Sequence, residues 1–210
     1  MSDAIDKILV RRAAVLIPLV KNEDGAYSLL YEVRAYDLDM QPGDVCFPGG
    51  AVEEGEDVRE AVLREAEEEL LISRDQITQL TQLPDVQGPG TVVTPFSGVI
   101  TGYTGTFSKA ETDHVFTVPV SYLQSFTPEV YEARYEARLP EDFPYEKIFG
   151  GRSYPFGYRG NEICFYDIPQ ELRRVYGTPD PSKPLPVLWG FTGRLTRFYL
   201  WKYARDITGS

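Results

Sequence analysis

Two apolar, β-branched runs lie near the start of the chain. Residues 12–20 end before a turn signal at residues 22–25, and residues 27–34 follow that turn. This pattern predicts a β-hairpin. Further apolar and aromatic runs, bounded mostly by turn-forming residues, predict strands at residues 45–47, 77–83, 91–101, 114–119 and 162–168.

The strongest helical pattern covers residues 57–71, which are rich in Ala, Leu, Glu and Arg and contain neither Gly nor Pro. Residues 120–125 and 192–203 are further helix candidates. Because most strands follow one another without a helix between them, we expect an α+β fold, with a mixed sheet flanked by helices. The apolar residues of the strongest helix recur at helical intervals: Val58, Ala61, Val62, Ala66 and Leu70.

The chain has 210 residues, of which 42% are hydrophobic and 13% aromatic, enough for a sizeable core. We expect a single domain over residues 1–210, with an aromatic-rich insertion containing a hairpin at residues 126–168. No apolar stretch is long enough to cross a bilayer, and residues 1–12 do not resemble a signal peptide, so we expect a cytoplasmic protein without a membrane partner.

Charge and cysteine content narrow the function classes. The net charge of −11 argues against nucleic acid as a main partner. It does not exclude a small polyanionic substrate, because a metal and a few arginines can invert the field within one pocket. The spacing of Cys46 and Cys164 suggests neither a disulfide framework nor a zinc site, so we expect two ordinary buried thiols.

Three glutamates of the predicted helix are candidate metal ligands. Glu65, Glu68 and Glu69 stand at i, i+3 and i+4, so a helix places their carboxylates on one side. Like charges at this spacing destabilise an isolated helix. A hard divalent cation such as Mg²⁺ or Mn²⁺ would relieve the repulsion, because these ions prefer carboxylate oxygens. The alternative is a solvated acidic face without a ligand.

The segment containing these glutamates resembles the Nudix box. It runs Gly50, five residues, Glu56, seven residues, and then Arg64-Glu65-Ala66-Glu67-Glu68-Glu69-Leu70-Leu71-Ile72. One fixed position differs, because Leu71 stands where the family usually has the Gly that ends the helix. The resemblance implies a Nudix fold and a metal-dependent hydrolase. The fixed Gly50, Glu56 and Arg64 make a merely solvated face the minor alternative.

The resemblance also assigns roles to these residues. It implies that Glu65, Glu68 and Glu69 bind Mg²⁺ or Mn²⁺, together with the backbone carbonyl of Gly49, and that one of the three also acts as a base. It implies a structural ion pair between Glu56 and Arg64 that holds the loop against the helix. Gly50 is expected at the substrate.

A second pattern upstream resembles the signature of bacterial coenzyme A pyrophosphatases within the Nudix group. Arg34, Ala35, Gly43 and the Phe-Pro-Gly-Gly of residues 47–50 fit it, whereas Asp39 replaces a second Arg. The resemblance implies hydrolysis of coenzyme A or an acyl derivative to 4'-phosphopantetheine, or its acyl form, and adenosine 3',5'-bisphosphate. Arg34 is then the first candidate for binding the diphosphate, since a guanidinium can bind phosphate oxygens in pairs.

Some assignments stay open at this stage. Glu111 is a candidate extra ligand or general base, or else a solvated loop residue. His114 is a candidate base or a structural histidine. The Asp39 substitution leaves another nucleoside diphosphate derivative, such as ADP-ribose or NADH, as an alternative substrate. A nucleotide-binding domain without catalysis is a further alternative, although the box carboxylates are kept. Homodimers are common in the family, but the sequence carries no independent dimer signal.

Overall fold

The computed structural model describes residues 11–88, 90–135, 138–156 and 158–204. Strand β1 (Arg11–Lys21) and strand β2 (Tyr27–Arg34) form the predicted hairpin, with Leu19 opposite Leu29. The helices are α1 (Val58–Leu70), α2 (Val120–Ser125) and α3 (Gly190–Lys202). The other strands are β3 (Val45–Cys46), β4 (Gly49–Ala51), β5 (Ile77–Gln82), β6 (Val86–Gly88), β7 (Thr91–Ile100), β8 (Thr112–Pro119), β9 (Glu129–Tyr135), β10 (Tyr158–Tyr166), β11 (Arg174–Tyr176) and β12 (Leu188–Trp189).

Among the described residues, nine strands form a mixed sheet in the order β11-β8-β2-β1-β7-β5, with β3, β4 and β6 paired to β2, β1 and β7. Strands β1 and β7 are parallel, whereas the other pairs in this sheet are antiparallel. The strands and helices predicted from the sequence are all present near the expected residues. The α+β prediction is therefore confirmed.

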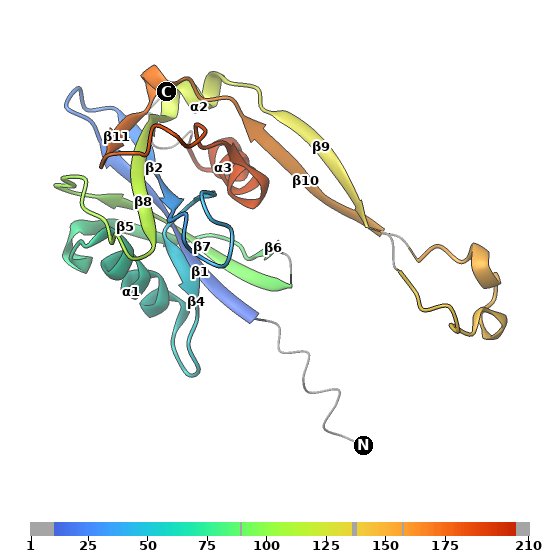
Figure 1. Ribbon diagram of the computed structural model, residues 1–210. Helices are drawn as coiled ribbons and strands as arrows, with labels where there is room; N and C mark the ends of the chain where they lie inside the picture. The colour runs from blue at the N-terminus through green and yellow to red at the C-terminus, as the bar shows by residue number, and fades with distance from the viewer. Residues whose placement is uncertain (1–10, 89, 136–137, 157, 205–210) are drawn as a thin grey trace.

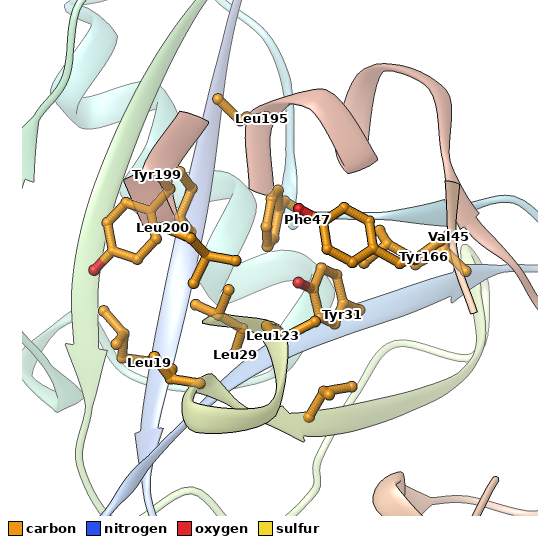
Figure 2. Close-up of a cluster of buried hydrophobic side chains, with 14 of the residues drawn as sticks. Leu19, Leu29, Tyr31, Val45, Phe47, Leu123, Tyr166, Leu195, Tyr199 and Leu200 are labelled. Atoms are coloured by element: carbon orange, nitrogen blue, oxygen red, sulfur yellow. The ribbon is translucent and has the colours of Figure 1, made fainter. Parts of the chain in front are cut away.

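Helices cover both faces of the sheet (Figure 1). Side chains alternate between faces along a strand, so Ile17 and Leu19 of β1 join a core with α2 and α3, whereas Leu16 and Val20 join a core with α1. In the first of these cores, side chains of α3 meet those of β1 and β2 (Figure 2). The Tyr31 hydroxyl and the Thr196 hydroxyl, 3.2 Å apart, add a buried hydrogen bond between β2 and α3.

A second, three-stranded sheet was not predicted. Strands β9 and β10 pair as the hairpin expected within the insertion, but β12 joins them on the other edge of β10. The β9–β10 hairpin projects away from the larger sheet (Figure 1). The predicted mixed sheet and the predicted hairpin are thus both present, and the pairing of β12 with β10 is an addition to them. Phe165 and Trp189, which stack at a centroid distance of 5.6 Å, pack across the β10–β12 pair.

No helix in the described ranges is both long and apolar enough to cross a membrane.

Helix α1 begins and ends where the sequence pattern placed it. The Asp57 carboxylate caps its first turn by accepting a hydrogen bond from the Arg59 N–H at 2.8 Å. At its end, Leu71 takes the left-handed conformation, with φ 53° and ψ 43°. Leu71 thus takes the left-handed conformation at the position where the Nudix-box resemblance implies a glycine. Its Cβ makes this conformation sterically strained.

Replacing Leu71 with Gly is expected to stabilise the protein. The left-handed conformation costs a residue with a Cβ about 1 kcal/mol, and the exposed Leu71 side chain loses little packing when removed, since it is 57% exposed. We expect urea unfolding to show a gain of about 1 kcal/mol for Leu71→Gly. Leu71→Ala is the matched control and should show no such gain, because it keeps the Cβ. Equal stability of the two variants would contradict this explanation of the turn.

Candidate active site

The glycine-rich loop before α1 is held directly beneath the helix carboxylates. Strand β4 pairs with β1, placing Gly49 opposite Val15 and Gly50 opposite Ala14. The Gly49 N–H donates a hydrogen bond of 2.7 Å to Oε2 of Glu69. A Cβ on Gly50 would overlap the Glu65 carboxylate, so a larger residue there would displace that carboxylate from its present position. The sequence thus brings the Phe-Pro-Gly-Gly loop and two box carboxylates together.

Arg64 of α1 forms hydrogen bonds to the glycine-rich loop and to a neighbouring box glutamate. Its Nε and Nη2 donate to the two oxygens of Glu56 at 2.9 and 3.1 Å, a bidentate pair. Its Nη2 also donates to the Ala51 carbonyl at 3.1 Å, and its Nη1 to Glu65 at 2.8 Å. These hydrogen bonds from Arg64 hold the pKa of Glu56 below its usual range. The contact expected between Glu56 and Arg64 is present, and it joins the loop to the helix.

The three box glutamates differ in environment. Glu69 is buried, Glu65 is largely buried, and the side chain of Glu68 is 60% exposed. Burial raises the pKa of Glu69 to about 8, with repulsion from Glu65 and Glu111 contributing. Burial also raises the pKa of Glu65. A carboxylate kept out of water beside like charges is costly for the protein to ionise, unless a cation joins it.

Arg34 and Glu111 both lie within electrostatic reach of Glu69. The positive charge of Arg34 favours the ionised form of Glu69, whereas the charge of Glu111 opposes it. Arg34 is oriented by a hydrogen bond of 3.2 Å from its Nε to the Met40 carbonyl. The Glu111 carbonyl accepts a hydrogen bond of 2.8 Å from the Ala35 N–H, which places the Glu111 loop against the end of β2. Glu111 itself is exposed.

The other titratable candidate, His114, has a local partner. Its Nδ1 lies 2.7 Å from an Asp113 carboxylate oxygen, and its side chain is only 4% exposed. Its ring packs near Phe116, with 6.4 Å between centroids. These contacts favour a structural histidine over a base.

Glu32 is the site residue that sequence reasoning missed. It lies on β2, is 1% exposed, and interacts electrostatically with Glu69, Glu111 and Arg34. The available signal was a single acidic residue within an otherwise apolar run, Leu29-Leu30-Tyr31-Glu32-Val33. A charged residue inside a buried strand is rare enough to indicate a partner or a function.

The donor set fits a hard divalent cation chemically. Within the ranges the structure describes, no three His, Cys, Asp or Glu side chains already converge as an ion would require. The carboxylates of Glu65 and Glu69 nevertheless repel each other at a buried position, and carboxylate and carbonyl oxygens are the ligands that Mg²⁺ and Mn²⁺ prefer. Glu65, Glu68, Glu69 and the Gly49 carbonyl are therefore the residues that would hold such an ion.

Comparison with known proteins decides the family. Residues 10–150 match the NUDIX domain family. The chain belongs to the Nudix family. The loop, helix and Arg64–Glu56 pair described above are thus this protein's Nudix box.

The curated relatives within the family match only part of this chain. The chain is 44% identical over 92 residues to the uncharacterized Nudix hydrolase NudL of Enterobacter sp. (strain 638), covering 43% of this chain and 47% of that protein. It is 32% identical over 133 residues to the peroxisomal coenzyme A diphosphatase NUDT7 of Mus musculus, covering 62% of this chain and 55% of that protein. The chain spans about half the length of the curated relatives it matches.

Among solved structures, the NUDIX domain of Shewanella oneidensis NrtR, complexed with ADP ribose, matches with a TM-score of 0.47 and 15% identity, covering 60% of this chain and 82% of that one. A C. elegans Ap4A hydrolase matches with a TM-score of 0.45 and 22% identity, covering 55% of this chain and 85% of that one.

The raised pKa of Glu69 in the Nudix box predicts a pH dependence. Its ordinary value is 4.5, and in the folded protein it rises to about 8. Between these values the folded state holds a proton that the unfolded chain has released, so the free energy of unfolding falls as pH rises. Without divalent ions, the protein should melt at a higher temperature near pH 5 than near pH 8. Glu69→Gln should flatten this dependence. Stability that increases from pH 5 to pH 8 would contradict the assignment.

Proposed function

We propose that this chain is a metal-dependent Nudix pyrophosphohydrolase. It would cleave the diphosphate of coenzyme A, or of an acyl-CoA, to 4'-phosphopantetheine, or its acyl form, and adenosine 3',5'-bisphosphate. The observation that carries the proposal is the buried Glu69, bonded to the Gly49 N–H at 2.7 Å and lying within the electrostatic reach of Arg34. Hydrolysis of a diphosphate requires this combination of hard-metal ligands and a cation for phosphate.

Each residue has a distinct task in this mechanism. Glu65, Glu68, Glu69 and the Gly49 carbonyl would hold the divalent ion, which when bound neutralises diphosphate oxygens and lowers the pKa of water. The planar guanidinium of Arg34 would bind phosphate oxygens and orient the P–O–P linkage. A box carboxylate or Glu111 would accept the proton of the attacking water. The Arg64–Glu56 pair would keep the loop in register with the helix.

The substrate part of the proposal rests on the second motif and on one relative. Arg34, Ala35, Gly43 and the Phe-Pro-Gly-Gly segment fit the coenzyme A signature, and the similar mouse protein is named a coenzyme A diphosphatase. Asp39, which stands where that signature has Arg, favours keeping ADP-ribose or NADH as the alternative substrate. A cytoplasmic location, a single domain and a homodimer stay predictions.

Product analysis tests this function directly. The purified protein would be incubated with coenzyme A, ADP-ribose and NADH, each with Mg²⁺ and with Mn²⁺, and the products identified by mass spectrometry. We expect coenzyme A to be cut fastest, giving 4'-phosphopantetheine and adenosine 3',5'-bisphosphate, and EDTA to stop the reaction. Much faster cleavage of ADP-ribose than of coenzyme A would overturn the assignment of coenzyme A as the substrate. Binding of all three without cleavage would favour the non-catalytic alternative.

A further inference from the structure

Glu32 lies inside the protein at the face of the sheet that α1 covers. On β2, Leu30 belongs to the core beneath α1, whereas Tyr31 belongs to the opposite core. Glu32, two residues after Leu30, therefore faces α1. It stands directly opposite Cys46 of β3 and Val115 of β8, so strands flank it on both sides. Its side chain is consequently almost completely removed from water, at 1% exposure.

One oxygen of this carboxylate has no partner among the described residues. Oε1 is buried there without a hydrogen bond, whereas the Thr112 hydroxyl forms a hydrogen bond to the carboxyl group. The charges it meets from neighbouring elements are Glu69 of α1, Glu111 of the loop before β8, and Arg34 of its own strand. Two of the three are repulsive, and Arg34 also donates to the Met40 carbonyl and interacts with Cys46.

An unpartnered buried carboxylate oxygen is expensive, and sheet strands tolerate apolar residues at such positions. Its position beside Glu69 indicates a positively charged partner beyond Arg34, which the described part of the chain does not provide. The two carboxylates approach from opposite directions, because Glu69 comes from the helix and Glu32 from the strand beneath it. Oxygen ligands that converge from separate elements suit a hard divalent cation.

We propose that Glu32 is an additional, strand-borne ligand of a divalent cation, shared with Glu69. The inference rests on the proposed role of Glu69 as a metal ligand and extends the metal site from the helix to the sheet. Glu32 would complete the inner side of the ion's coordination, where water cannot reach, while Glu65 and Glu68 serve its solvent side.

Mn²⁺ binding to the metal-free protein tests this inference without substrate. The free Mn²⁺ signal in electron paramagnetic resonance would be followed for the wild type, Glu32→Gln, Glu69→Gln and Glu54→Gln. Glu54 is exposed on the loop before α1, so its variant has the same charge change away from the site. We expect Glu32→Gln to weaken binding roughly tenfold or more, or to remove one bound ion, and Glu54→Gln to bind as the wild type does.

The outcomes separate this inference from the proposed function. A wild type that binds no Mn²⁺ would overturn both. Loss of binding in Glu69→Gln with wild-type binding in Glu32→Gln would overturn only the role of Glu32, and would indicate a neutral structural acid.

Thermal melting provides the second readout. Metal-free Glu32→Gln should melt above the metal-free wild type at alkaline pH, because Gln cannot acquire the charge that burial and Glu69 oppose, and Mn²⁺ should raise its melting temperature less than that of the wild type. A metal-free Glu32→Gln that melts lower or fails to fold would show that the protein itself satisfies Glu32, and would overturn the inference.

Discussion

Glu69→Gln is expected to lower the turnover number roughly 100-fold or more, because metal assistance contributes several kcal/mol to phosphoryl transfer and each 1.36 kcal/mol is a factor of ten. An amide is a poor ligand for a hard cation. Its oxygen can still accept the 2.7 Å hydrogen bond from the Gly49 N–H, so the fold should persist. Steady-state rates with coenzyme A and Mg²⁺ measure the effect, with circular dichroism as the check on folding.

Glu67→Gln is the matched control for this variant. Glu67 lies on the same helix but pairs with Arg74 at 2.9 Å, away from the loop. It should keep nearly full turnover. Glu68→Gln should also lower the turnover number, as Glu69→Gln does, because Glu68 is the expected metal ligand on the solvent side. Near wild-type turnover in both Glu68→Gln and Glu69→Gln would contradict the assignment of these residues as metal ligands.

Gly49→Ala is expected to destabilise the protein by at least about 3 kcal/mol, the combined scale of backbone strain and overpacking. The Gly49 φ of 149° is in a region that side chains rarely adopt, and a Cβ there would overlap the backbone of Ala14 and Val15 on β1. Backbone atoms of a central strand cannot move aside cheaply. Because Gly49 also bonds to Glu69, turnover should fall with stability. Urea unfolding measures the stability change.

Gly55→Ala distinguishes the cost of backbone strain at a positive φ from the cost of steric overlap with β1. Gly55 also has a positive φ, 80°, but a Cβ there would meet no atom of the described residues within 4 Å. It should cost only about 1 kcal/mol. Equal losses in the two variants would contradict the claim that β1 crowds Gly49.

Much of the architecture could be predicted because it depends on local patterns. The alternation of residues 27–34 and the helical spacing of residues 57–71 predict the elements that build the site, and the ends of β2 and α1 agree closely. The box spacing likewise predicts which side chains meet, because Gly49, Arg64 and Glu69 are separated by a short loop and a single helix. Local periodicity and short connections carry this information.

What could not be predicted depends on pairing between distant segments. Glu32 is buried because α1 covers its face of the sheet and β3 and β8 flank β2, and the partners Cys46 and Val115 lie far from it in sequence or across a loop. The second sheet needs β12 to meet β10, with Phe165 opposite Trp189. No periodicity within either segment specifies these partners.

The aromatic insertion shows the same limit. The rings of Tyr154 and Phe156 pack against each other, with 4.8 Å between their centroids. The Arg152 guanidinium lies over the Tyr145 ring, 4.4 Å from its centroid. The segment between β9 and β10 that contains them lies far from α1 (Figure 1).

Anomalous diffraction from crystals soaked in Mn²⁺ tests the central claim most directly. The account predicts an anomalous peak contacting Glu69 and the Gly49 carbonyl, with Glu65 or Glu68 turned towards it. Well-occupied Mn²⁺ elsewhere in the crystal, with no peak at α1 and with Glu69 still bonded only to the Gly49 N–H, would contradict it.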